Sequence, residues 1–133
     1  EDCIAGPFRT AFTVAAELCI ALAEGGYPAP ADVGDLTACV CHSLADCYRA
    51  AVDELEALTG RRIACLRVVG GGCRNDYLNR LTARALARPL TAGPAEATAI
   101  GNLLSQLLHA GEIHTLAEGR ALVRASFTLK AYA

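Results

Sequence analysis

Apolar residues follow a helical period over much of the chain. From Asp35 to Thr59 they fall three or four positions apart and form one stripe of a long helix, which Gly60 ends. Similar patterns predict helices at about 14–24, 76–87 and 96–110. A last helix is expected from Thr115, where "TLAE" has the spacing of a capping box, to about Ala125. Residues 1–13 show no clear period.

Two short segments have the composition of strands. "IACLRVV" (Ile63–Val69) is apolar enough to be buried on both faces, as in a parallel sheet, and "RPLTA" reads as a second strand. The tail to Ala133 is expected to be irregular. Because two parallel strands cannot form a complete sheet, the pattern predicts an α/β fold that is helix-rich, with an incomplete sheet, and indicates a piece of a longer protein.

Composition narrows the class of protein. The 133 residues are 53% hydrophobic and 20% charged with a net charge of -2, which is typical of a soluble globular domain with its own core. No basic patch indicates nucleic acid, and no apolar run is long enough to span a membrane. We therefore expect neither as a partner.

The seven cysteines leave several interpretations open. An odd number and a high aliphatic content argue against a disulfide scaffold and favour cysteines as small buried residues. A zinc site is the alternative, and its ligands would be Cys39, Cys41, His42 and Cys47. A disulfide between Cys19 and Cys39 is conceivable if their helices pack antiparallel. The three histidines have no spacing that suggests a catalytic triad.

The sequence "VVGGGCRNDYLNRL" places three glycines between a predicted strand and a predicted helix. Gly70, Gly71 and Gly72 would let backbone N–H groups approach a phosphate, which side chains obstruct. The turn is not a P-loop, because it lacks the lysine, and it is not a complete dinucleotide fingerprint. Alone, it is equally well interpreted as a tight structural turn.

A second glycine site follows in "AGPAEATAIGNLL". Glu96 falls at the first turn of its helix, where it is favourable to the dipole, and it could instead orient the glycine turn. Gly101 falls inside the helix, where glycine costs about 1 kcal/mol relative to alanine. Either close packing of the helix against a strand or close approach to a ligand would explain it.

Together these motifs resemble a known family. "VVGGGCRNDYLNRLTARAL" followed by "RPLTAGPAEATAIGNLLSQ" is similar to the carboxy-terminal part of the FGGY carbohydrate kinases. "SLADCYRAAVDELEALTG" and "LAEGRALVRASF" resemble the rhamnulokinase branch. The resemblance covers about Val14–Phe127, and "GPFRTAF" resembles a segment that normally lies further from the long helix, so residues could be missing after Thr13.

The resemblance implies that residues 1–133 are a carboxy-terminal nucleotide-binding domain with an actin-like, ribonuclease-H-like fold. Gly71 and Gly72, with Gly70, would lie against the α-phosphate and ribose of ATP, and Asn75 would place its amide near the adenosine. From their own positions in the sequence, Glu96 and Gly101 are expected to lie behind this site and support it. The intact kinase would be cytoplasmic and would use ATP and Mg²⁺, with the metal held mainly by residues outside this chain.

The resemblance also implies what this chain lacks. Phosphoryl transfer needs a base and a metal carboxylate, and the family's base is an aspartate in a Gly-His-Asp type stretch upstream. No aspartate here has that context, so no catalytic residue is expected and the isolated chain should be inactive. The intact enzyme, with its amino-terminal domain, would phosphorylate the 1-hydroxyl of L-rhamnulose. The rivals are a kinase for xylulose, fuculose or another ketose, and a non-catalytic helical interaction module.

Overall fold

The computed structural model describes the backbone of residues 5–133 and the side chains from Val14 onward. The chain forms two compact units, residues 1–40 and residues 41–133. The first unit contains helix α1 (Ala5–Glu24) and the beginning of helix α2 (Val33–Thr59). The backbone from Ala5 is therefore helical although residues 1–13 show no clear period, while residues 1–4 lie outside the described part.

Helix α2 begins and ends where local chemistry requires. The Asp32 carboxylate accepts the N–H of Asp35 at 2.8 Å, and the Asp35 carboxylate accepts the N–H of Ala31 at 3.1 Å. These bonds satisfy N–H groups that have no partner inside the helix. At the other end Gly60 adopts a left-handed φ of 65°, and its N–H donates to the Glu56 carbonyl at 2.9 Å. The predicted long helix is confirmed.

The second unit carries a three-stranded sheet. The strands are β1 (Leu66–Val68), β2 (Leu90–Ala92) and β3 (Lys130–Tyr132), in that spatial order. β1 and β2 are parallel, as predicted, with Leu66 opposite Leu90. β3 is antiparallel to β2, with Tyr132 opposite Leu90. The expectation of an irregular tail is therefore wrong, because the last residues pair with the edge of β2 that β1 leaves open.

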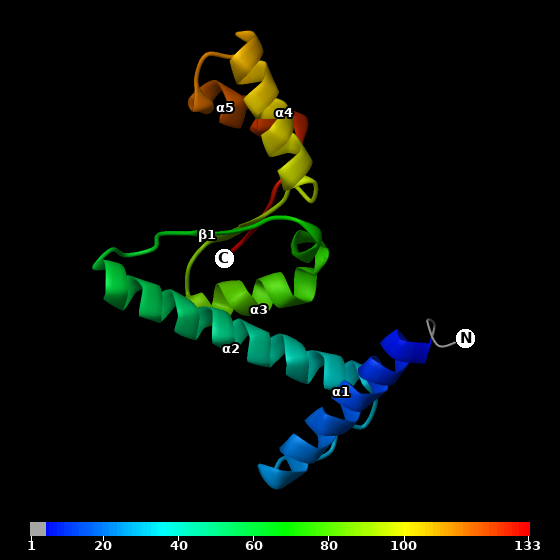
Figure 1. The fold of residues 1–133 in the computed structure, drawn as a ribbon. Coiled ribbons are helices and arrows are strands. Elements are labelled where there is room, and N and C mark those ends of the chain that lie inside the picture. The colour runs from blue at the N-terminus through cyan, green and yellow to red at the C-terminus, as the bar shows by residue number, and fades with distance from the viewer. Residues whose placement is uncertain (1–4) are drawn as a thin grey trace. The chain divides into compact units, whose positions relative to one another are not determined.

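The core lies between the sheet and helix α3 (Asp76–Leu86), which runs alongside the strands (Figure 1). Leu90, on the central strand, is fully buried, and Leu66 and Val68 pack partly buried beside it. Arg67 points to the other face and is exposed, as is Val69 at 52%. The expected strand of seven residues buried on both faces is thus a strand of three with one covered face. Among the described residues no strand pairs with the other edge of β1.

Side chains fasten α2 to this layer within the second unit. Arg88 donates to both oxygens of the Glu56 carboxylate at 2.6 and 2.9 Å, and to the Ile63 carbonyl at 2.9 Å. The guanidinium, followed by the Ile63 N–H, lowers the pKa of Glu56. Near the other end of α3, the Tyr77 hydroxyl lies 3.2 Å from Nε2 of His42. These links hold the loop before β1 and the start of α3 to one helix.

Two more helices follow β2. Helix α4 (Ala97–Ala110) ends at Gly111, which is left-handed at φ 78°. Helix α5 (Leu116–Ser126) is capped by Thr115, whose hydroxyl accepts the Glu118 N–H at 3.1 Å, so the predicted capping position is confirmed. Gly119 is buried, and a Cβ there would lie 3.4 Å from side-chain atoms of Leu104 and Ile113. No helix in the described part is long and apolar enough to cross a bilayer.

Candidate functional site

The glycine turn leaves the carboxyl end of β1 and is hydrogen-bonded to the turn that follows β2. Gly70 has a φ of 74°, a left-handed value that favours glycine, and its N–H donates to the Pro94 carbonyl at 3.3 Å. The N–H of Gly93 donates to the Val68 carbonyl at 2.8 Å. Because these bonds join the two loops, the carboxyl ends of both parallel strands form one edge, where open α/β sheets bind ligands.

Gly71 and Gly72 have a different role from Gly70. Both are exposed in a short 3-10 helix, Gly71–Arg74, and neither has a left-handed φ. A Cβ built on Gly71 meets no atom within 4 Å, and one on Gly72 meets only Val68 Cγ1 at 3.8 Å. Neither backbone conformation nor packing among the described residues therefore requires glycine at these two positions. A close approach by something outside this chain would require it.

Asn75 connects the turn to helix α3. Its side-chain oxygen accepts the N–H of Leu78 at 3.0 Å, which caps the helix. The Asn75 N–H donates to the Gly72 carbonyl at 3.1 Å. The expected contact of its amide with adenosine stays a prediction. The capping bond to Leu78 holds the Asn75 side chain at the start of α3.

Asp76, the first residue of α3, binds the end of the chain. Its carboxylate accepts the Tyr132 hydroxyl at 2.6 Å and the Lys130 ammonium at 3.0 Å. The hydroxyl and then the ammonium lower the pKa of Asp76, while the carboxylate raises the pKa of both Tyr132 and Lys130. Strand β3 is thereby attached to the residue that follows the glycine turn.

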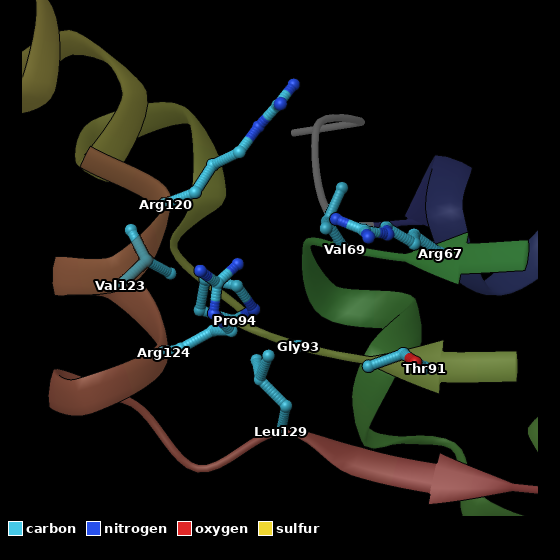
Figure 2. Close-up of a pocket in the computed structure, with 9 residues that line it drawn as sticks. All are labelled: Arg67, Val69, Thr91, Gly93, Pro94, Arg120, Val123, Arg124 and Leu129. Atoms are coloured by element: carbon cyan, nitrogen blue, oxygen red, sulfur yellow. The ribbon is translucent and has the colours of Figure 1, made fainter. Parts of the chain in front are cut away.

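A cavity of about 310 Å³ opens beside this edge of the sheet (Figure 2). Val69, Gly93 and Pro94 line it from the two loops, and Arg120 and Arg124 extend into its rim from α5. Arg67 reaches it from the face of β1 opposite α3. None of the three arginines forms an ion pair within the part of the chain that the structure describes. The cavity is therefore positively charged, which favours an anion.

Glu96 and Gly101 belong to the second glycine site, at the start and in the interior of helix α4. Glu96 is the N-cap of α4 but makes no side-chain capping bond, and one of its carboxylate oxygens stands 3.8 Å from Nη2 of Arg74 in the glycine turn. Both side chains are more than 70% exposed, so the pair contributes little stability. A Cβ on Gly101 would meet no atom within 4 Å. Close packing on a strand, one of the two expected reasons for this glycine, is thus absent from the described residues.

Comparison with known sequences agrees with this geometry. Residues 12–110 match the carboxy-terminal domain of the FGGY family of carbohydrate kinases. The chain belongs to the FGGY family. The domain has the actin-like ATPase fold, so the small mixed sheet with its helices is part of that architecture.

Several curated relatives within the FGGY family are rhamnulokinases. The chain is 42% identical over 132 residues to the rhamnulokinase of Bacteroides thetaiotaomicron, covering 99% of this chain and 26% of the relative. It is 43% identical over 109 residues to that of Halalkalibacterium halodurans, covering 82% and 23%. It is 44% identical over 103 residues to the rhamnulokinase of Bacillus subtilis, a match that covers 77% of this chain and 21% of the relative. The chain thus spans about a quarter of the length of these relatives, and it is rhamnulokinase-like.

The cysteines of this FGGY domain form no bond or ligand cluster in the described residues. Cys19, on an exposed position, and Cys39 are free thiols, so the structure has no disulfide between them. Cys41 is buried on α2, and among the described residues no three Cys, His, Asp or Glu side chains gather as metal ligands. Cys73, the residue after the three glycines, is buried in the core cluster, in the manner of a small apolar residue.

Sequence reasoning missed two features of the site. The arginines of the cavity come from segments far apart in the chain, and no local signal connects them. Asn79 was also missed, although it shares helical spacing with the buried residues Thr82, Ala83 and Leu86. An amide at the start of a buried stripe is a signal that was readable from the sequence.

Proposed function

We propose that this chain is the ATP-binding part of a kinase that transfers the γ-phosphoryl of ATP to the 1-hydroxyl of L-rhamnulose. Membership of the FGGY family and the similarity to rhamnulokinases support the reaction. The observation that carries the nucleotide site is the pair Gly71 and Gly72, which the described residues leave open. A phosphate or ribose seated there would occupy the space that side chains would fill.

The charge beside the turn supports the same assignment. ATP is a polyanion, and the cavity with Arg67, Arg120 and Arg124 supplies positive potential at the edge where the turn lies. The turn provides backbone donors without side chains in their way. In this proposal Gly71 and Gly72 contact the α-phosphate and ribose, and Asn75 presents its amide to the adenosine.

We place the catalytic base, the sugar contacts and the ligands of Mg²⁺ in the remainder of the intact protein. Mg²⁺, when bound, would neutralise the charge that develops on the transferred phosphoryl group. Within the described residues no cluster of carboxylates gathers to hold such an ion. By itself the chain would bind nucleotide weakly and would not turn over substrate. We place the intact protein in the cytoplasm, as the family resemblance implies.

The test uses the intact protein that contains this chain, with ADP release coupled to a spectrophotometric reaction. L-Rhamnulose should give the highest kcat/KM in a panel with D-xylulose and L-fuculose. Gly71→Val should raise the KM for ATP about tenfold or more, equivalent to roughly 1.4 kcal/mol, and leave the sugar KM nearly unchanged. Because a Cβ at Gly71 meets no atom of the described residues within 4 Å, folding should be preserved.

Ala57→Val is the matched control, since it adds similar bulk to an exposed position of helix α2. It should leave both KM values unchanged. An unaltered ATP KM in Gly71→Val would show that the turn is only structural. A higher kcat/KM for another ketose than for L-rhamnulose would show that the proposed sugar substrate is wrong.

A further inference from the structure

A buried side-chain amide on helix α3 is hydrogen-bonded to the residue that follows the three glycines. Asn79, on α3, is 2% exposed and is among the largest fully enclosed side chains of the described residues. Its Nδ2 donates to the carbonyl of Cys73 at 3.1 Å. Cys73 directly follows the three glycines and is itself buried. A polar group this deeply buried is stabilising only while its partner stays in place.

The bond from Asn79 fixes the peptide group of Cys73, which directly follows the three glycines. The N–H of Cys73 donates to the Gly70 carbonyl at 3.2 Å, and the N–H of Asn79 donates to the Asn75 carbonyl at 3.0 Å. The Gly70 carbonyl, before Gly71 and Gly72, is therefore bonded within the turn to Cys73, and the Cys73 carbonyl, after them, is bonded to helix α3 through the Asn79 side chain. Neither glycine contributes a side chain that could hold its own backbone in place.

We propose that Asn79 is a positioning residue for the nucleotide. Its amide keeps the Cys73 carbonyl directed into α3, and this orients the N–H groups of Gly71 and Gly72 outward, toward the ligand. The inference rests on the proposed nucleotide site, because it assigns to Asn79 the task of presenting that site. Asn79 does not touch the ligand.

The chain supplies a matched control in Thr82. This residue is 1% exposed, lies on the same buried stripe of α3, and donates its hydroxyl to the Leu78 carbonyl at 2.8 Å. Its hydrogen bond stays within the helix and does not reach the turn. Thr82→Val removes one buried hydrogen bond, and Asn79→Ala removes the bond to Cys73 together with a side-chain hydrogen bond to Tyr132, so only the asparagine variant releases the Cys73 carbonyl.

The experiment is performed on the intact enzyme with two readouts. Asn79→Ala should raise the ATP KM about tenfold, with the sugar KM unchanged, whereas Thr82→Val should stay within about twofold of the parent for both. Hydrogen exchange of a peptide covering residues 69–76, measured without nucleotide, should be faster in Asn79→Ala than in Thr82→Val. Asn79→Leu, which keeps the branched shape of the side chain but has no donor, should repeat the Asn79→Ala result if the alanine variant is too unstable to assay.

The outcomes separate this inference from the proposed function. If Gly71→Val raises the ATP KM but neither Asn79 variant changes the ATP KM or the exchange of the turn, the positioning role is refuted. If exchange quickens while the ATP KM stays unchanged in both the Asn79 and the Gly71 variants, Asn79 holds the turn but the nucleotide assignment fails. An equal rise in ATP KM for Thr82→Val would show that any loss of stability in α3 has the same effect, which also overturns the inference.

Discussion

Replacing Gly101 with alanine should make helix α4 more stable. Gly101 lies in the interior of a 14-residue helix, is exposed, and has no left-handed φ. A Cβ at this position meets no atom of the described chain within 4 Å. The substitution therefore adds no clash and gains the difference in helix propensity, about 1 kcal/mol.

The size of this effect can be measured locally. If α4 opens by local unfolding, about 1 kcal/mol slows amide exchange of the helix roughly fivefold. Hydrogen exchange followed by mass spectrometry on peptides covering residues 97–110 of the intact enzyme gives this value. The glycine-turn peptide, residues 69–76, is the internal reference and should not change.

A leucine at the same position separates stability from ligand approach. Leucine has nearly the helix propensity of alanine, so α4 should gain similar protection in Gly101→Leu. If α4 turns its Gly101 side toward the glycine turn, leucine should obstruct the nucleotide and reduce the ATP-induced rise in melting temperature. Ala99→Leu, an exposed position on another side of α4, should keep the full rise.

Two results would refute this reasoning. Unchanged or faster exchange of α4 in Gly101→Ala would mean that the Cβ meets a neighbour in the intact enzyme. A full ATP-induced shift in Gly101→Leu would mean that α4 does not face the nucleotide, and the two glycine sites would then not form a single surface.

Two further predictions concern charge. Asp76→Asn should lower the unfolding midpoint at about pH 7. Tyr132 and Lys130 lower the pKa of Asp76 in the folded state, so its carboxylate contributes stability above the ordinary carboxyl pKa of 3.8. The difference from the parent should shrink below pH 3.8 and disappear as the pH falls through the lowered pKa of the folded state. Asp46→Asn, which breaks an exposed pair with Arg49, is the control, and a difference that persists in acid would contradict this account. Arg120→Gln combined with Arg124→Gln should raise the ATP KM about two- to fivefold at low salt and less at about 0.5 M salt, because mobile ions screen the cavity's charge. Arg49→Gln should have no effect, and a salt-independent change would rule out an electrostatic cause.

The sequence by itself determined the features that depend on neighbours three or four residues apart. The stripe of α2, its stop at Gly60, the cap at Thr115 and the glycine turn between β1 and α3 were all predicted, because each depends on local periodicity or on one residue's conformational preference. The parallel pairing of β1 and β2 followed from their order around a helix. The family was indicated by the spacing of the motifs, and the match to the family over residues 12–110 confirms it.

Only the tertiary structure decided the features that join distant parts of the chain. Strand β3 was expected to be irregular, because three residues carry no periodic signal and its stability comes from pairing with β2 and from Asp76, 54 residues before Lys130. The exposed face of β1 was also unpredictable, since apolar residues alone do not show which face a helix covers. The arginine-lined cavity and the bond from Asn79 to Cys73 exist only once the chain has folded, because charge and hydrogen bonding act through space and the sequence records no such distances.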